Sequence, residues 1–327
     1  MKVFLTGASG FVGSHVLDAL IAGHHQVSIL LQATSNTAFI SRHLTAVTVH
    51  LGSLDDVPLL TRGMSGVEAV VHCAGKTKAL KEAEFHRVNQ GGTRNVVTAA
   101  NACHESMRHL VYISSQAVSG PADLNRPAEE TVEPHPVSVY GRSKWLGEIE
   151  VRQHCRVPWT VLRPAAVYGP RDTEFLPIFQ KVKQRLMPLL SGAKRPFNMV
   201  YGPDVAAAVL CCLLQEESRG QTYHVASDPP CTDEEFMEKI AAHLKVRPVR
   251  LRIPRWGLTL AAAIQETLSM ATGRPHMLSR QKLPELMAPG WVCSTEGIRR
   301  ELGFTAPTCL REGVGRTIEW YRREGWL

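Results

Sequence analysis

The sequence predicts an α/β fold, in which a doubly wound parallel sheet is joined by a smaller, mainly helical region near the C-terminus. Two observations predict it. Through the first half of the 327 residues, short apolar runs alternate with longer stretches of helical spacing, the pattern of parallel strands and crossover helices. Apolar residues also make up 44% of the chain and charged residues 20%, so the chain can bury a large core.

The strands of the sheet follow from their composition. Short apolar runs bounded by turn residues are typical of buried parallel strands. Such runs occupy residues 3–6, 27–31, 47–51, 69–73 and 110–114, and two later ones occupy 159–162 and 222–225. Between strands, residues 12–22 and 88–102 have the apolar spacing of helices.

The second half is more irregular, because prolines interrupt it. Helices are expected at residues 175–186, 204–214, 233–244, 258–272, 295–302 and 310–322. The strand at 222–226 is expected to rejoin the first sheet. We therefore divide the chain into a sheet region at 1–165 and a discontinuous region at 166–327, which is expected to bind the substrate.

Charge and cysteine content argue against several classes of protein. Lys and Arg total 37 and Asp and Glu total 30, and this mild excess of +7 fits an anionic ligand better than a nucleic acid. The longest apolar run, residues 205–214, is shorter than the roughly 20 residues that span a bilayer. The N-terminus lacks the pattern of a signal peptide. The eight cysteines include no C-x-x-C pair, so no metal site is expected. We expect them to be reduced thiols in a cytoplasmic protein.

A glycine-rich loop follows the first strand. It reads Thr6-Gly7-Ala8-Ser9-Gly10-Phe11-Val12-Gly13 and opens the first helix, which is the context of a dinucleotide phosphate loop. Gly7 permits the tight turn, Gly10 lets the backbone approach a pyrophosphate, and Gly13 lets the helix pack close to the strand. The N-terminus of the helix attracts phosphate. Residues 1–165 are therefore expected to form a Rossmann-type dinucleotide-binding domain.

The end of the second strand bears on the choice of cofactor. An acid there would bind a ribose 2′-hydroxyl and repel a 2′-phosphate. Residues 30–36 hold neither an acid nor an Arg. Gln32, Ser35 or Arg42 can meet a 2′-phosphate, and the same residues also suit an ordinary loop. The pattern slightly favours NADP over NAD.

A second motif indicates acid/base chemistry. Tyr140 and Lys144 are four residues apart, so on a helix they share one face. A nearby ammonium favours the phenolate, and a pKa lowered from about 10 makes a tyrosine an acid/base near neutral pH. Ser115 follows a buried strand at the carboxyl edge of the sheet, where such sheets bind ligands. It is placed to hydrogen-bond a reacting oxygen, with Ser114 as the alternative.

These motifs resemble the extended short-chain dehydrogenase/reductase family, also called the NAD-dependent epimerase/dehydratase family. The resemblance covers nearly the whole chain, with some likeness to the 3β-hydroxysteroid-dehydrogenase/dihydroflavonol-reductase-like branch. Besides the loop and the Ser-Tyr-Lys set, the similar segments are residues 51–55, 71–75, 88–96, 163–171, 199–205 and 291–327. Ser53 and Pro203 stand where the family usually has Asp.

The resemblance implies hydride transfer between a nicotinamide and a secondary alcohol or carbonyl, and it implies the residues that take part. Ser115, Tyr140 and Lys144 match the family's catalytic residues, and the last two also contact its cofactor. The other implied cofactor contacts are Gly7, Ser9, Gly10, Phe11, Val12, Gly13, Gln32, Leu54, Ala74, Gly75, Asn89, Ser114, Pro164 and Val167. The implied substrate contacts are Lys76, Gln116, Tyr168, Arg171 and Arg195.

The type of reaction stays open at this point. Dehydration is not expected, because Ser115-Gln116-Ala117 stands where dehydratases have Thr-Asp-Glu. We expect an NAD(P)-dependent oxidoreductase that acts on a bulky substrate, as a homodimer. The alternatives are a nucleotide-sugar epimerase with tightly bound NAD and a non-catalytic NAD(P)-binding regulator.

Three segments of the second half have more than one interpretation. Residues 256–263 carry no charge, which fits three interpretations: they cover an apolar substrate, they belong to the core, or they form a dimer contact. Lys194 and Arg195 are either a diphosphate contact or a solvated turn. Residues 245–255 hold five cations and no acid, which is typical of a solvated face and otherwise suits an anionic substrate or a membrane surface.

Overall fold

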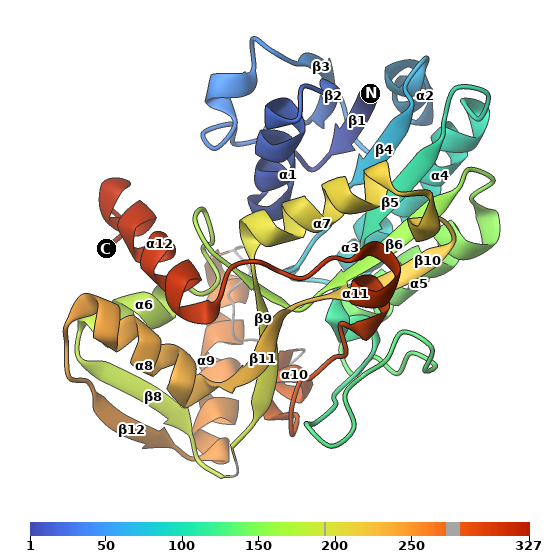
Figure 1. Ribbon diagram of the computed structural model, residues 1–327. Coiled ribbons are helices and arrows are strands. Elements are labelled where there is room, and N and C mark those ends of the chain that lie inside the picture. The colour runs from blue at the N-terminus through green and yellow to red at the C-terminus, as the bar shows by residue number, and fades with distance from the viewer. Residues whose placement is uncertain (193, 273–281) are drawn as a thin grey trace.

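The computed structural model describes residues 1–192, 194–272 and 282–327, with 266–272 described as backbone only. Its main feature is a seven-stranded parallel sheet in the order β10-β6-β5-β4-β1-β2-β3 (Figure 1). The strands are β1 (Lys2–Thr6), β2 (Gln26–Leu31), β3 (Thr48–Leu51), β4 (Ala69–His72), β5 (His109–Ile113), β6 (Trp159–Pro164) and β10 (Gln221–Val225). The strand order reverses between β1 and β4, and such a reversal opens a crevice at the carboxyl ends of the strands.

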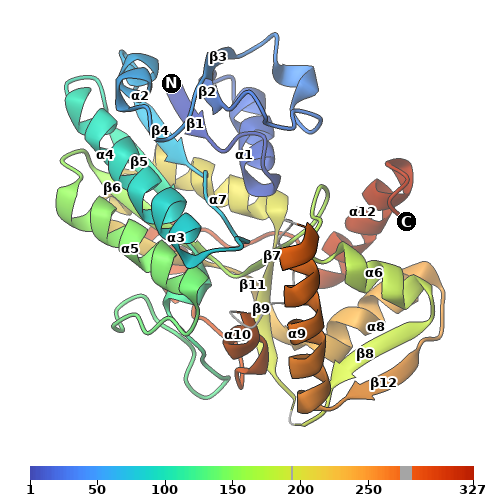
Figure 2. The same ribbon diagram turned by 180° about the vertical axis from the view of Figure 1, so that it is seen from behind.

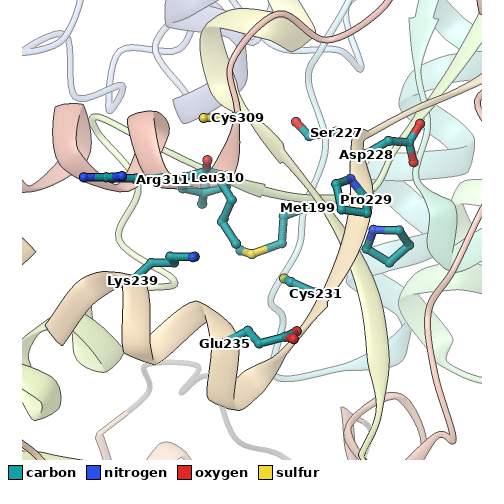
Figure 3. Close-up of a pocket in the computed structure, with 12 residues that line it drawn as sticks. Met199, Ser227, Asp228, Pro229, Cys231, Glu235, Lys239, Cys309, Leu310 and Arg311 are labelled. Carbon is teal, nitrogen blue, oxygen red and sulfur yellow. The ribbon is translucent and has the colours of Figure 1, made fainter. Parts of the chain in front are cut away.

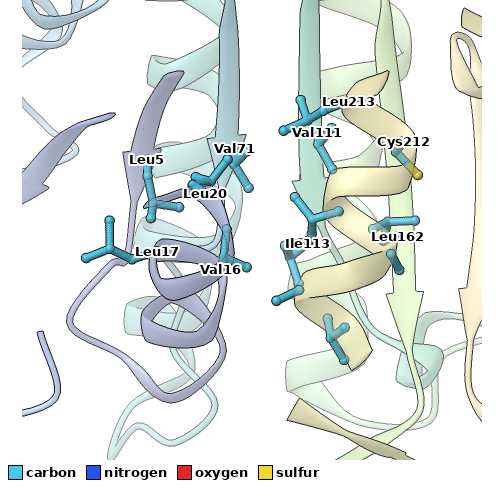
Figure 4. Packing of buried hydrophobic residues seen from close by; sticks show 14 of the residues in the cluster. Leu5, Val16, Leu17, Leu20, Val71, Val111, Ile113, Leu162, Cys212 and Leu213 are labelled. Atoms are coloured by element: carbon cyan, nitrogen blue, oxygen red, sulfur yellow. The ribbon is translucent and has the colours of Figure 1, made fainter. Parts of the chain in front are cut away.

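Helices cover both faces of this sheet. On one face, α1 (Phe11–Ala22) and α7 (Gly202–Leu214) lie side by side (Figures 1 and 2). Their apolar side chains meet those of the strands, as Leu17 and Leu20 do beside Leu5 (Figure 4). The other face carries α2 (Val57–Met64), α4 (Gly92–Ala102) and α5 (Val139–His154). Strands buried on both sides explain why their sequences are continuously apolar.

The second region combines helices with two small sheets. One sheet has the order β11-β9-β7, and the other pairs β12 with β8 in parallel. Their bounds are β7 (Ala166–Tyr168), β8 (Leu186–Leu190), β9 (Pro196–Tyr201), β11 (Ser227–Thr232) and β12 (Val249–Ile253). The helices are α6 (Leu176–Lys183), α8 (Asp233–Leu244), α9 (Arg255–Thr272), α10 (Leu283–Met287), α11 (Glu296–Leu302) and α12 (Leu310–Arg323). A cluster of aromatic and aliphatic side chains, centred on Phe179 and Phe236, joins α6, α8 and α12.

The seven predicted strands of the main sheet are confirmed, each within two residues of its expected ends. One prediction about them is wrong: β3 is mostly exposed rather than buried, because it is the edge strand of the sheet. The helix expected at 175–186 is too long, since α6 ends at Lys183 and Leu186 already begins β8. The five strands of the second region were not predicted.

Candidate active site

The backbone is tightly packed where β1 and β4 end. Gly7 follows β1 with a φ of +76°, in the left-handed region that glycine tolerates. A Cβ on Gly7 would lie 2.6 Å from the backbone nitrogen of Ala74, which follows β4. A Cβ on Gly13 would lie 2.0 Å from the Gly7 carbonyl oxygen. Both glycines are therefore required by contact between backbone segments.

The first turn of α1 is open to a ligand. Gly10 precedes the helix, and no side chain caps it. The first N–H groups of a helix have no partner within the helix, and they attract anions. Those of Phe11, Val12 and Gly13 belong to this turn. The residues present therefore fit the pyrophosphate of a dinucleotide.

A buried polar network lies below the loop. Thr6 Oγ1 is 2.6 Å from His72 Nδ1, and His72 Nε2 is 3.1 Å from Thr93 Oγ1. The Thr93 hydroxyl in turn donates to the Asn89 carbonyl at 2.6 Å. Burial lowers the pKa of His72 to about 3, so its imidazole is neutral and can donate through one nitrogen and accept through the other. The network joins β1, β4 and the segment that leads into α4.

Asn89 lies in a π-helical turn (His86–Gly91) that leads into α4. Its Oδ1 accepts from the Lys76 N–H at 2.7 Å, and its Nδ2 donates to the Lys76 carbonyl at 3.0 Å and to Ser143 Oγ at 2.9 Å. The amide thus ties the loop after β4 to α5. A Cβ on Gly75 would come within 3.1 Å of Asn89 Oδ1, so these two predicted cofactor residues are close together.

The candidates for a 2′-phosphate contact lie after β2. Gln32 is exposed, and its N–H donates to Ser35 Oγ at 3.0 Å. Arg42 pairs with Asp18 on α1 at 2.9 Å. Two of the three candidates, Ser35 and Arg42, therefore already have partners in the protein. Nearby, the carbonyl of Leu54, a predicted cofactor residue, accepts from the Asn95 side chain at 2.9 Å.

Helix α5 brings Tyr140 and Lys144 to the end of β5. Ser138 caps α5 by accepting a backbone N–H at 3.0 Å, which puts Tyr140 in the first turn and Lys144 one turn later. The Lys144 ammonium is buried, donates to the Ile113 carbonyl at 2.6 Å, and lies 4.3 Å from the centre of the Tyr112 ring. These contacts hold its Nζ in one place.

The two candidate serines have different partners. Ser115 Oγ accepts from the Ala117 N–H at 3.2 Å, and the Ser115 hydroxyl also hydrogen-bonds the Tyr140 side chain. Ser114 instead donates to the buried Glu148 carboxylate at 2.6 Å. Of the two, Ser115 is the one brought together with Tyr140.

The pKa shifts in the site are set mainly by burial. Burial raises the pKa of Tyr140 above its usual value, the carboxylates of Glu285 and Glu174 raise it further, and the hydrogen bond with Ser115 lowers it. The spacing of Tyr140 and Lys144 predicts a lowered pKa for Tyr140, and in this structure the shift has the opposite sign. Burial lowers the pKa of Lys144 to about 8, partly offset by Glu148. At neutral pH the chain therefore presents a neutral phenol near a largely charged ammonium.

Glu148 is a site residue that was not predicted from the sequence. This fully buried carboxylate is paired with the equally buried Arg163 through bonds of 2.9 and 2.7 Å. Arg163 also donates to Ser119 Oγ at 3.2 Å, and Ser119 Oγ lies 2.8 Å from His224 Nε2 on β10. Glu148 is one helical turn beyond Lys144, so the spacing along α5 is a signal that could have found it.

Charged groups from three segments meet near Tyr140. Glu174, in the loop before α6, accepts from Thr77 at 3.0 Å and pairs with Lys78 at 3.3 Å and Lys282 at 3.6 Å. Glu285 on α10 accepts from Ser138, the cap of α5. The loop after β4, the loop before α6 and the start of α10 therefore come together beside the phenol. None of these contacts was predicted from the sequence.

The five predicted substrate residues differ in whether the protein itself supplies partners for their polar atoms. The Nε2 of Gln116 is buried and has no partner in the described part of the chain, and the same holds for one guanidinium nitrogen of Arg171. Buried unpaired donors are uncommon and are often satisfied by a ligand. A second guanidinium nitrogen of Arg171, Nη2, pairs with Asp18 at 2.6 Å. Lys76 pairs with Glu84.

The remaining two predicted substrate residues are engaged by the protein. Tyr168 is fully buried, and its ring contacts those of Tyr201 and Phe236. Arg195 donates to the Leu286 carbonyl at 2.8 Å and to Asp233 at 3.3 Å. The diphosphate contact suggested for Arg195 stays a prediction. Pro164 ends β6 and Val167 lies in β7, next to the crevice of the sheet.

A cavity of 360 Å³ lies elsewhere in the second region. Met199, Cys231 and Lys239 are among the residues that line it, and it lies between β9, β11, α8 and the start of α12 (Figure 3). None of Ser115, Tyr140 and Lys144 lines it, so it is separate from the candidate active site. Tyr168 faces this cavity.

Comparison with known proteins identifies the family. Residues 3–226 match the family model described as "NAD dependent epimerase/dehydratase family". The chain is 31% identical over 331 residues to a ceramide reductase of Caulobacter vibrioides, covering 99% of this chain and 96% of that protein. The chain therefore belongs to the NAD-dependent epimerase/dehydratase family, and it stands among the enzymes of the extended short-chain dehydrogenase/reductase type.

Two further relatives extend the comparison. An N-acetyl-alpha-D-glucosaminyl-diphospho-ditrans,octacis-undecaprenol 4-epimerase of Escherichia coli O157:H7 is 23% identical, over 98% of this chain and 95% of its own. The crystal structure of gox2253 superposes with a TM-score of 0.82 at 24% identity, covering 100% of this chain and 99% of that one. The latter confirms the predicted Rossmann-type fold. In the described residues, no helix is both long and apolar enough to cross a membrane.

Proposed function

We propose that this protein is an NAD(P)-dependent ketoreductase, which reduces a carbonyl group on a substrate with a long hydrocarbon chain. The observation that carries the proposal is that Ser115, Tyr140 and the buried, fixed ammonium of Lys144 lie together at the end of β5. Burial raises the pKa of this phenol, so it holds its proton at physiological pH. A neutral phenol that is hydrogen-bonded to Ser115 is suited to give a proton to a carbonyl oxygen.

The bound nicotinamide would supply the hydride. The chain supplies the rest. Ser115 orients the carbonyl oxygen, and Tyr140 donates the proton to it. Lys144, fixed by the Ile113 carbonyl, stabilises the phenolate that remains and holds a ribose hydroxyl of the cofactor. Gly7, Gly10 and Gly13, with the N–H groups of the α1 first turn, hold the pyrophosphate.

The substrate class is supported by the two relatives described above. One is named a ceramide reductase and the other acts, by its name, on an undecaprenol-linked sugar. Both names describe substrates with long hydrocarbon chains. In this chain, Trp256 and Leu260 of α9 are exposed, so the core interpretation of residues 256–263 is wrong for them and apolar surface is present in the second region.

A chain-length series tests this proposal. Ketones with short, medium and long alkyl chains, dispersed in detergent, are supplied with reduced cofactor, and absorbance at the nicotinamide band is followed. We expect kcat/KM to rise with chain length, since each buried methylene contributes about 0.8 kcal/mol. Tyr140→Phe is the inactive control. Equal kcat/KM for all chain lengths, or turnover by Tyr140→Phe equal to that of the parent, would contradict the proposal.

Epimerisation is the second candidate, favoured by the relative from Escherichia coli. An epimerase must regenerate its cofactor in each cycle and therefore retains it. Release of NAD from the denatured, freshly purified protein, together with interconversion of lipid-linked hexose epimers and no net oxidation, would favour this candidate over the reductase. Turnover of any of these substrates would exclude a non-catalytic regulator.

Cofactor preference is a finer part of the proposal. The absence of an acid in residues 30–36 supports NADP(H), and exposed Gln32 is the side chain best placed to meet its 2′-phosphate. Titration with NADPH and NADH is expected to give the lower Kd for NADPH. Gln32→Asp should reverse the order, because an acid repels the 2′-phosphate.

Oligomeric state and location complete the proposal. The homodimer expected from the family resemblance is tested by light scattering of the purified chain. The cytoplasmic location is supported by the eight cysteines, which are all free thiols in this structure. Fractionation of the source cells tests it.

A further inference from the structure

Exposed apolar side chains are concentrated in one short segment. Val249 and Leu251 on β12 are 62% and 43% exposed, and Trp256, Leu260 and Ile264 on α9 are 71%, 55% and 53% exposed. These five are among thirteen large apolar residues exposed in the described part of the chain, yet they fall within sixteen consecutive residues. We call them the 249–264 face. Scattered single residues are ordinary, whereas such a concentration indicates an interaction surface.

The backbone geometry of β12 explains its part of this face. Arg250 reaches Glu234 and Glu238 on α8 at 2.6 and 2.7 Å, so Arg250 points to the α8 side of the small sheet. Side chains alternate along a strand, so Val249 and Leu251 point to the opposite side. Their parallel partners on β8 are Leu186 and Pro188, which point the same way. The side of this sheet away from α8 is therefore apolar.

Helix α9 continues the apolar surface. Trp256, Leu260 and Ile264 are spaced four residues apart, so they form one line along the helix. In Figure 2, α9 and the small sheet of β8 and β12 both face the viewer. α9 also contacts α10, which carries Glu285 near Tyr140. The face is thus close to the rim of the candidate active site.

Cations flank this face. Lys245 and Arg247 precede β12 and Arg255 begins α9, while Arg252 shares the α8 side of β12 with Arg250. Residues 245–265 contain no acid. Among the described residues, only Arg250 of this segment's five cations has a carboxylate partner. Two copies of the chain joined through this face would bring like charges together, which is unfavourable. An anionic surface would instead be attracted to them.

We propose that the 249–264 face docks reversibly on an anionic lipid bilayer. The apolar side chains lie in the interface, with Trp256 at the depth that tryptophan prefers, and the flanking cations contact lipid phosphates. The proposal extends the proposed function, because a ketoreductase for long-chain substrates would then take them up at the membrane surface. Binding to lipid can nevertheless be measured without any substrate.

Sedimentation with vesicles tests the proposal. The full chain is mixed with vesicles of equal parts phosphatidylcholine and phosphatidylglycerol, and with vesicles of phosphatidylcholine alone. We expect binding to the first and weak binding to the second, with affinity falling as salt rises. The double variant Trp256→Ser/Leu260→Ser should bind about tenfold more weakly. Arg247→Gln/Arg255→Gln should lose mainly the dependence on phosphatidylglycerol.

The matched control is Leu124→Ser, which removes a leucine that is 60% exposed in the loop before α5. It should bind vesicles as the parent does, and circular dichroism checks that all variants are folded. Absence of vesicle binding by the parent, or full binding by the Trp256/Leu260 variant, would overturn the proposal. So would conversion of a parent dimer to a monomer by that variant, which would make the face a contact between copies. Ketone reduction without lipid binding would leave the proposed function standing and reject only the docking.

Discussion

The sheet region and the second region differ in how their candidate site residues are held. In the sheet region, Gly7 and Gly13 are required by backbone contacts, and Tyr140 and Lys144 are placed by one helix. In the second region, Tyr168 is engaged by a core and Arg195 by an internal hydrogen-bond network. The comparison teaches that a motif on one loop or helix fixes its own geometry. The role of a residue between motifs depends on distant parts of the chain.

The largest expected effect contrasts one tyrosine from each region. Tyr140→Phe removes the proposed proton donor, and kcat should fall by about 10³-fold while cofactor Kd stays within a few-fold. Tyr168→Phe is the matched control, because its hydroxyl has no partner in the described residues. Steady-state kinetics and cofactor titration are the measurements. A larger loss in Tyr168→Phe than in Tyr140→Phe would break the comparison.

The next effect tests the buried pair on α5 and β6. Glu148→Gln leaves the Arg163 guanidinium buried without a charged partner, which should lower the free energy of unfolding by about 3 kcal/mol. It also removes the charge that raises the pKa of Lys144, so the loss of activity at high pH should begin at a lower pH. Urea unfolding and a pH–rate profile measure the two effects.

Glu312→Gln, which removes an exposed partner of Arg316, is the control and should change stability by less than about 1 kcal/mol. If Glu148→Gln destabilises the chain but leaves the pH–rate profile unchanged, then Glu148 has only a structural role and does not raise the pKa of Lys144 in the active enzyme.

A third prediction concerns the phosphate loop. Gly13→Ala places a methyl group against the Gly7 carbonyl, so the loop must move and dinucleotide Kd should rise by about 10²-fold. Gly257→Ala on α9 is the control, because its nearest neighbour would lie at 3.5 Å. Calorimetric titration with NADPH measures both. Equal affinity in the two variants would show that the close contact in the loop is dispensable.

The smallest effect is the pH dependence of stability. The pKa of Lys144 is about 8 in the folded chain and 10.5 in an exposed lysine, so the unfolded chain binds more protons between these values. Stability should therefore rise with pH from 8 towards 10, relative to Lys144→Met, by about 2 kcal/mol. Below pH 8 both states are protonated and the difference stays constant. Equal slopes of unfolding free energy against pH for the parent and Lys144→Met would contradict the lowered pKa of Lys144.

The sequence predicts the sheet well because each buried strand is a local apolar run, and the match in family and fold confirms this. The small sheets were not predicted, although β12 reads Val249-Arg250-Leu251-Arg252-Ile253, an alternation of apolar and charged residues that indicates a half-exposed strand. The roles of Ser115, Tyr140 and Lys144 stay predictions, although the structure brings the three together. The sign of the Tyr140 shift could not be predicted, because burial and the carboxylates of Glu174 and Glu285 depend on distant chain.

The return of the chain to the main sheet limits how the protein can be divided. β10 pairs with β6 only after α6, α7 and three strands of the second region (β7, β8 and β9) have been built. A fragment ending at residue 165 would leave β6 as an open edge, with unpaired N–H and C=O groups that can template aggregation. It would also expose Arg163 and Ser119, which His224 on β10 helps to cover. Expression of the nucleotide-binding half alone should therefore yield insoluble protein, and a chimaera should keep residues 221–225 with it.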